Sequence, residues 1–174
     1  MNFGQRERLL GKCGKMNRNQ FWKDKSVLIT GVTGLVGSSL AARLIGMGAR
    51  IVGVVRDEVV SSNFYQSGMN KIVTVVHGNL EDYSFLERTM NEYNIEVVYH
   101  LGAQTIVGTA NRSPISTIKS NIEGTWNVLE ACRGKDHVSA IVVASSDKAY
   151  GIHRVLPYRE DFPLNAEYPY DVSK

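Results

Sequence analysis

Short apolar runs alternate with amphipathic stretches through most of the chain. The runs have three to five residues and lie at 27–29, 51–55, 72–76, 97–101 and 140–144. Runs of this length, bounded by glycine or polar residues, are typical of buried strands. Between them, apolar residues recur at the three- and four-residue spacing of a helix in 36–47, 85–93 and 122–132. This alternation predicts an α/β fold, a doubly wound parallel sheet with helices on both faces.

A glycine-rich turn follows the first of these runs, in the sequence VLITGVTGLVG at 27–37. Gly31 tolerates a positive φ, Gly34 lets the backbone approach a pyrophosphate, and Gly37 lets a helix lie close to the strand. The helix that begins at the turn directs its free N–H groups at an anion. The turn therefore predicts a Rossmann-like dinucleotide site at the carboxyl end of the first strand.

The end of the second predicted strand carries two opposite charges, Arg56 and Asp57. Asp57 lies about 20 residues beyond the last glycine of the turn, where Rossmann folds place the acid that binds the adenosine ribose. An arginine at the same place can instead hold a ribose 2′-phosphate. The pair therefore favours NAD through Asp57 and leaves NADP open through Arg56.

The composition is that of one ordinary globular domain, with 174 residues of which 43% are hydrophobic and 21% charged. The formal net charge is +3, but residues 1–25 hold seven Lys and Arg against Glu7 and Asp24. The remainder, 26–174, therefore carries a small negative charge, which is not typical of a nucleic-acid-binding domain. We interpret residues 1–20 as a basic, disordered leader and 21–174 as the dinucleotide-binding domain.

Cysteine and histidine usage indicates neither a disulfide framework nor a metal site. Cys13 and Cys132 lie far apart and lack paired spacing, as in proteins of a reducing compartment. The four histidines are dispersed, and His100, near a strand end, is interpreted as a packed core residue. The leader has only Leu9 and Leu10 where a signal peptide needs an apolar core, and no run has the length of a membrane span. These features favour a cytoplasmic protein without a membrane partner.

Polar residues gather at the end of the fifth predicted strand, in SSDK at 145–148, and again near residue 174. Pro169 can occupy the first turn of a helix that places Tyr170 and Lys174 on one face. A lysine one turn away, together with the charge of an oxidised nicotinamide, favours the phenolate and lowers the pKa of a tyrosine. Tyr170 can then take a proton from a substrate hydroxyl held by Ser146 while hydride passes to the cofactor.

Five motifs together carry a resemblance to a known family: GVTGLVG, HLGAQ, NIEGTWNVLEA, SSDKAYG and Tyr170-x-x-x-Lys174. Over residues 21–174 the chain resembles the extended short-chain dehydrogenase/reductase family of NAD-dependent nucleotide-sugar epimerases and dehydratases. It is most similar to the CDP-glucose and GDP-mannose 4,6-dehydratases. The resemblance implies a nucleotide-sugar substrate and a redox-neutral reaction: oxidation at C4, loss of water across C5 and C6, and return of the hydride to C6.

The resemblance also implies catalytic roles. Ser146, Tyr170 and Lys174 correspond to the Ser/Thr, Tyr and Lys of the family, and Lys174 also contacts the nicotinamide ribose. Dehydratases carry an acidic pair or Asp-Lys after the Ser/Thr, whereas epimerases usually have small neutral residues there. Asp147 is then the acid that protonates the departing 6-hydroxyl, and Lys148 the base at C5, once desolvation lowers its pKa. In the alternative interpretation, Asp147 and Lys148 only form an ion pair at the strand end.

The predicted cofactor contacts combine this resemblance with the charge pair after the second strand. They are Gly31, Thr33, Gly34, Leu35, Val36, Gly37, Arg56, Asp57, Asn79, Leu80, Leu101, Gly102, Ala103, Tyr170 and Lys174. Asn79 departs from the family, which normally has an acidic residue there to accept from the adenine amino group; the asparagine carbonyl accepts more weakly. Gln104, Thr105 and Ser146 are expected to approach the sugar.

The resemblance implies that relatives continue beyond Lys174 with further strands and a carboxy-terminal region that holds the nucleotide-sugar. That C-terminal substrate region is absent from these 174 residues, so we expect weak cofactor binding and little turnover. A homodimer through helices beside the sheet is compatible with the family. Two other functions stay open: a nucleotide-sugar 4-epimerase or related oxidoreductase, and a non-catalytic dinucleotide-binding fragment that binds a partner through exposed apolar surface.

Overall fold

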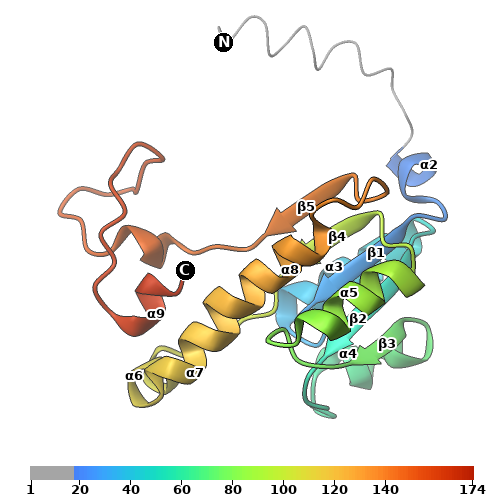
Figure 1. Ribbon diagram of the computed structural model, residues 1–174, viewed down its shortest axis with the longest axis horizontal. Coiled ribbons are helices and arrows are strands. Elements are labelled where there is room, and N and C mark those ends of the chain that lie inside the picture. The colour runs from blue at the N-terminus through green and yellow to red at the C-terminus, as the bar shows by residue number, and fades with distance from the viewer. Residues whose placement is uncertain (1–17) are drawn as a thin grey trace, which may run out of the picture.

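A computed structural model describes residues 18–174 (Figure 1). In chain order, the elements are α2 (Arg18–Trp22), β1 (Ser26–Thr30), α3 (Leu35–Gly46), β2 (Arg50–Val55), α4 (Asn63–Gln66), a 3₁₀ turn (Met69–Lys71), β3 (Thr74–His77), α5 (Tyr83–Glu92), β4 (Val97–His100), α6 (Val107–Arg112), α7 (Pro114–Ile118), a π-helical turn (Lys119–Glu123), α8 (Gly124–Cys132), β5 (Ala140–Val143), a 3₁₀ turn (Asp147–Tyr150) and α9 (Pro169–Val172). The last three residues of the predicted leader lie in α2, and its residues 1–17 lie outside the described part.

The strands form one parallel sheet in the order β3-β2-β1-β4-β5. β1 pairs with β2 from Ser26 and Arg50 onward, and with β4 from Val27 and Val97 onward. The chain therefore moves outward from β1 to β3 and then crosses to the other side of β1. Ligands bind where the strand order reverses in this way, at the carboxyl ends of the strands, here β1 and β4. The predicted doubly wound α/β fold is confirmed.

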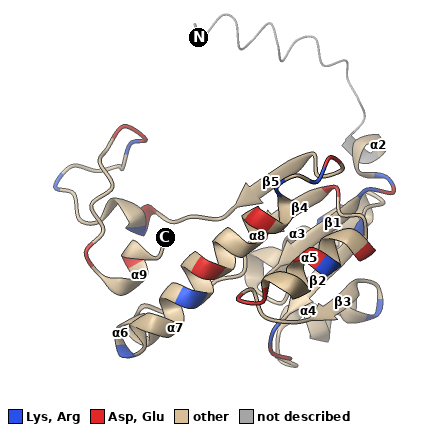
Figure 2. Ribbon diagram, viewed as in Figure 1, with Lys and Arg blue, Asp and Glu red and all other residues tan. Residues whose placement is uncertain are grey.

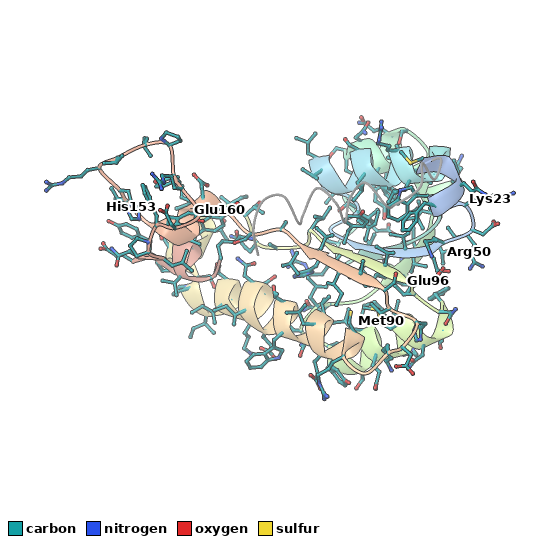
Figure 3. The ribbon with its side chains drawn as sticks, turned by 90° about the horizontal axis from the view of Figure 1, so that it is seen from above. Lys23, Arg50, Met90, Glu96, His153 and Glu160 are labelled. Atoms are coloured by element: carbon teal, nitrogen blue, oxygen red, sulfur yellow. The ribbon has the colours of Figure 1, made fainter. Side chains whose placement is uncertain are left out.

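Alternate residues of the strands face two separate cores, because successive side chains point to opposite sides of a sheet. Leu28 and Val98 face the core beneath α5 and α8. Val27 and Ile29 face the core beneath α3 and α4. Figure 3 shows the sheet edge-on between the helices of the two sides. The two buried faces fix the register of the strands, and with it the position of each strand end.

The amino ends of the strands are tied together by polar side chains. Lys25 Nζ lies 2.8 Å from Glu96 Oε1, and the backbone N–H of Ser26 donates to Glu96 Oε2. These two hydrogen bonds lower the pKa of the Glu96 carboxyl. Arg50 Nη2 donates to Ser26 Oγ, and Figure 3 shows Arg50 and Glu96 near each other at this end. The side chains at the strand starts are therefore paired with one another, and the candidate site is sought at the opposite ends.

Beyond β5 the chain leaves the sheet as an arm that ends in α9 (Figure 1). α9 packs against α6, α7 and the 3₁₀ turn Asp147–Tyr150. Ser145 Oγ donates to the carbonyl oxygen of Lys174 at 2.9 Å. The arm thus brings the end of α9 back to the end of β5. The helix start at Pro169 confirms the prediction.

Three details of the predicted elements are wrong. The third strand is Thr74–His77 instead of 72–76, because Ile72 ends a 3₁₀ turn and is exposed. The polar stretch 58–71, which no periodicity assigns to an element, contains α4 with a fully buried Phe64. Asn121, expected to precede the helix over 122–132, lies inside a helical rod that runs from α7 to α8. Within residues 18–174, no helix has both the length and the apolar character needed to cross a membrane.

Candidate functional site

A cavity of about 300 Å³ lies at the carboxyl ends of β1, β2 and β4. It brings together twelve of the predicted cofactor and substrate residues: Gly31, Thr33, Gly34, Arg56, Asp57, Asn79, Leu80, Leu101, Gly102, Ala103, Gln104 and Thr105. The sequence analysis missed four further lining residues, Val54, Val59, Gly78 and Ser120. Val54 is the last residue but one of β2, which was predicted, and its alternation with Val55 is the signal that could have placed it. Residues from five separate segments thus converge at the place that the fold assigns to a ligand.

The turn between β1 and α3 depends on glycine at two positions. Gly31 has φ of +69°, and a Cβ there would lie 2.8 Å from the Cα of Gly102. A Cβ on Gly37 would overlap the carbonyl oxygen of Gly31. The turn therefore holds three backbone segments closer together than side chains permit. This close approach leaves the cavity floor lined by backbone, as binding of a pyrophosphate requires.

The N-terminus of α3 faces this turn without a side-chain cap. Gly34 is its N-cap residue, and no side chain accepts from its first N–H groups. Leu35 and Val36, predicted as cofactor contacts, have exposed side chains and do not line the cavity, and Gly37 is buried behind it. Their part in binding can come only from backbone N–H groups at the positive end of the helix dipole. α3 therefore offers an anion site at the mouth of the cavity.

Arg56 and Asp57 lie side by side at the end of β2, and both line the cavity. Arg56 Nε is 2.6 Å from Asp57 Oδ2, and both side chains are more than half exposed. An ion pair this exposed contributes little to stability, so it does not by itself decide between NAD and NADP. Asn79 also lines the cavity, and its Oδ1 accepts from the N–H of Glu81 at 3.4 Å.

A chain of buried hydrogen bonds runs beneath the cavity floor. Thr30 Oγ1 accepts from the N–H groups of Leu101 and Gly102, so its own proton goes to His100 Nδ1, 2.8 Å away. His100 must then carry its proton on Nε2, which donates to Thr125 Oγ1 at 2.9 Å. The histidine is 3% exposed. His100 is therefore a hydrogen-bonded core residue, as predicted, and it joins β4 to α8.

His100 should remain neutral throughout the physiological pH range. Burial first, and the charge of Lys174 second, lower its pKa from 6.5 to about 4. Because the folded-state pKa lies below the unfolded one, stability is fully present above pH 6.5 and falls as the pH drops toward 4, by about 3 kcal/mol in total. A pH titration followed by NMR of the His100 imidazole checks this. A midpoint near 6.5 would contradict it.

Asn121 is a site residue that the sequence analysis missed. Its Oδ1 accepts from the N–H of Gln104 at 2.7 Å, and its Nδ2 donates to the Gln104 carbonyl and to Ser173 Oγ. Ser173 Oγ in turn donates to the carbonyl of Tyr170. Asn121 therefore connects the cofactor cavity to α9. The sequence signal was an asparagine at the edge of a helical pattern, a residue that helix interiors disfavour. The structure adds that Asn121 lies in a π-helical turn, a feature that is frequent at functional sites.

A second cavity, of about 710 Å³, lies between the turn after β5 and the end of α9. Ser146, Asp147 and Lys174 line it, whereas Lys148 and Tyr170 do not. Ser146 Oγ donates to Asp147 Oδ1 at 3.1 Å and accepts from the N–H of Lys148. Three of the five predicted catalytic residues thus share one cavity. Lys148, which is exposed, comes directly after the lining residue Asp147 in the chain.

Tyr170 and Lys174 lie close together, but the predicted helix does not carry both, because α9 ends at Val172 and Ser173 is its C-cap. Tyr170 is 9% exposed, and Lys174 Nζ lies 5.6 Å from the centre of its ring. Burial lowers the pKa of the Lys174 ammonium. Lys174 and Ser145 also line a cavity of about 400 Å³ that shares Gly102 and Ala103 with the cofactor cavity. Shared lining residues therefore link the dinucleotide turn to the catalytic residues.

Comparison with known proteins assigns this site to a family. The sequence profile of the family described as GDP-mannose 4,6 dehydratase matches residues 28–174, from β1 through Lys174. The chain belongs to this family. Its members are NAD-dependent enzymes that act on nucleotide-sugars, within the short-chain dehydrogenases/reductases. The resemblance drawn from the five sequence motifs is confirmed.

Individual relatives include both dehydratases and epimerases. The chain is 35% identical to a CDP-glucose 4,6-dehydratase of Salmonella typhimurium over 156 residues, which cover 88% of the chain and 44% of that enzyme. It is 35% identical to UDP-glucuronate 4-epimerase 1 of Arabidopsis thaliana over 144 residues, covering 78% of the chain and 33% of the epimerase. A UDP-glucose 4-epimerase from Brucella ovis, solved in complex with NAD, superposes with a TM-score of 0.73 and 30% identity, covering 86% of the chain and 44% of the epimerase. The chain spans less than half the length of these relatives.

Proposed function

We propose that the chain is the NAD-binding and catalytic part of a nucleotide-sugar 4,6-dehydratase. The observation that carries this assignment is Asp147, whose carboxylate follows Ser146 and lines the same cavity as Lys174. The similarity to a CDP-glucose 4,6-dehydratase supports it. An acid at this position can protonate a leaving hydroxyl, which a 4-epimerase does not require.

The residues of the first cavity fit a dinucleotide. Gly31 and Gly34 offer backbone at the floor, and the N-terminus of α3 offers N–H groups to a pyrophosphate. Asp57 lines the cavity and can accept from the ribose hydroxyls, which favours NAD. When bound, NAD accepts hydride from C4 of the sugar and returns it to C6.

Side chains in the second cavity and the adjacent Tyr170 and Lys148, which lie outside its lining, supply the proton transfers. Ser146 holds the C4 hydroxyl, and Tyr170 accepts its proton with the ammonium of Lys174 one turn away. Lys148 is exposed in the structure, so it acts as the base at C5 once the bound sugar covers its side chain. Asp147 protonates the hydroxyl that leaves C6 as water. A proton returned to C5 completes the exchange as hydride arrives at C6.

A nucleotide-sugar 4-epimerase is the second candidate, supported by the similarity to the Brucella ovis and Arabidopsis thaliana enzymes. A non-catalytic dinucleotide-binding chain is the third. Trp126 and Leu129 of α8 are exposed beside the sheet, and this supports a surface for a partner or for a second copy in a homodimer.

Product analysis separates these candidates. The chain is incubated with NAD and CDP-glucose, GDP-mannose or UDP-glucose, and the product is identified by NMR. A 4-keto-6-deoxy sugar supports the dehydratase, and a sugar inverted at C4 supports the epimerase. NAD binding without turnover by this chain, together with turnover by a version extended past Lys174, supports the non-catalytic chain.

Replacing Asp147 with asparagine should uncouple the two halves of the reaction. Elimination should slow by roughly 10²- to 10⁴-fold, because the amide cannot protonate the leaving hydroxyl. Reduction of NAD by C4 oxidation should continue, and absorbance in a single turnover measures it. Asp136→Asn, at an exposed position between α8 and β5, is the matched control. Equal loss of both steps in Asp147→Asn would assign Asp147 to binding rather than to elimination.

A further inference from the structure

Asp171 is a nearly buried carboxylate that the catalytic scheme above does not use. It lies in the first turn of α9, directly after Tyr170, and is 9% exposed. Its side chain forms no hydrogen bond or ion pair with another residue of 18–174, although its backbone carbonyl accepts from Lys174. Asp171 lines the 710 Å³ cavity together with Ser146 and Asp147. The carboxylate oxygens are therefore free to accept a hydrogen bond from a ligand in this cavity.

The charges around this cavity restrict the partner that Asp171 can take. Asp147 and Asp171 contribute two carboxylates, and Lys174 is the single ammonium among the described lining residues. Elsewhere on the described surface, both signs of charge are interspersed (Figure 2). The cavity is thus locally acidic, which disfavours a diphosphate or a carboxylate and favours neutral O–H donors.

The remaining walls suit a sugar ring. Tyr150, Leu164 and Val172 line the cavity with apolar atoms. Tyr150 is held in place by stacking on Tyr158, with ring centres 5.6 Å apart. A hexose presents C–H groups on its faces and hydroxyls at its rim, so it can pack on such a wall while donating to a carboxylate.

We propose that Asp171 binds a hydroxyl of the substrate's sugar and thereby selects a neutral hexose over a uronate. This inference rests on the proposed nucleotide-sugar function. A hydroxyl bound to Asp171 would place the sugar of the substrate between α9 and the turn after β5. The diphosphate of the substrate would then lie outside this cavity. This preference also separates the chain from relatives such as the UDP-glucuronate 4-epimerase, whose named substrate carries a carboxylate on the sugar.

Titration calorimetry on the NAD-loaded chain tests this with UDP-glucose, UDP-glucuronate and UDP, and with CDP-glucose and GDP-mannose. The parent chain should bind a neutral nucleotide-hexose more tightly than UDP-glucuronate. Asp171→Asn should weaken binding of the nucleotide-hexose by about tenfold or more, because a charge-assisted hydrogen bond is lost. Binding of NAD and of the nucleoside diphosphate alone should not change. Glu160→Gln, an exposed change in the same arm labelled in Figure 3, should behave as the parent.

The melting temperature provides a second readout, which a purely structural role would move in the opposite direction. Asp171→Asn should melt at or above the temperature of the parent, because the change removes no hydrogen bond or ion pair of the Asp171 side chain within residues 18–174. A lower melting temperature with equal losses for UDP and UDP-glucose would overturn the proposal in favour of a structural role. Unchanged hexose binding would overturn the role of Asp171 alone. If NAD binds and no nucleotide-sugar does, the proposed function fails, and the role of Asp171 fails with it.

Discussion

Replacing Gly34 with valine should lower the affinity for NAD by about a hundredfold while leaving the chain folded. Gly34 has φ of −74° and ψ of 169°, an extended conformation that valine adopts readily. A Cβ there would meet only the carbonyl oxygen of Gly31, at 3.2 Å, which a small shift relieves. The added methyl groups would lie on the wall of the 300 Å³ cavity, where the pyrophosphate must approach the backbone. Titration calorimetry with NAD and with NADP measures the loss and the preference between them.

Gly37→Val is the control for Gly34→Val. It should destabilise the whole fold, whereas Gly34→Val should affect only NAD binding. A Cβ at Gly37 would overlap the Gly31 carbonyl oxygen and press on Val32, so α3 could not lie against β1. Circular dichroism should show a lower melting temperature for Gly37→Val and an unchanged one for Gly34→Val. If folded Gly34→Val binds NAD as the parent does, the dinucleotide does not occupy this cavity. NADP binding stronger than NAD binding would mean that Arg56 leaves Asp57 for the 2′-phosphate.

Sequence periodicity identified the strands and the order of elements, but it misplaced several buried faces. In α3, Leu44 belongs to both the predicted and the observed face, whereas Val36 is exposed and Gly37 and Ser38 are buried instead. The close contact of Gly37 with the β1 turn rotates the helix so that its small residues face the sheet. The hydrophobic pattern alone therefore does not show which face of α3 is buried. The run at 140–144 forms an exposed edge strand, although its composition is that of a buried one.

The sequence predicted those residues whose role depends only on their neighbours in the chain. Asp82 caps α5 by accepting from the N–H of Phe85, as its position predicts. Asn121 and Asp171 could not be found in this way. The role of Asn121 depends on Gln104 and Ser173, which are far from it in sequence. The burial of Asp171 depends on the arm that returns to the end of β5. Such roles require the tertiary fold.

Replacing Tyr170 with phenylalanine should lower the rate of nicotinamide reduction by roughly 10²- to 10⁴-fold, the usual contribution of a positioned base. The hydroxyl forms no hydrogen bond with another residue of 18–174, and the ring keeps its packing against Lys174. The melting temperature and the affinity for NAD should therefore remain those of the parent. Single-turnover absorbance, calorimetry and thermal melting measure these three quantities on the same preparation.

Tyr168→Phe is the matched control for this change, because Tyr168 is the exposed N-cap residue of the same helix. It removes a phenol two residues from Tyr170 and should leave the rate unchanged. If Tyr170→Phe instead reduces NAD as fast as the parent, the proton at C4 leaves by another group, and Lys174 would hold the cofactor ribose without assisting a tyrosine base. If both variants slow the reaction equally, the effect arises from the position of α9 and not from the acidity of one phenol. Only a loss confined to Tyr170→Phe, with NAD binding intact, assigns the proton transfer to this side chain.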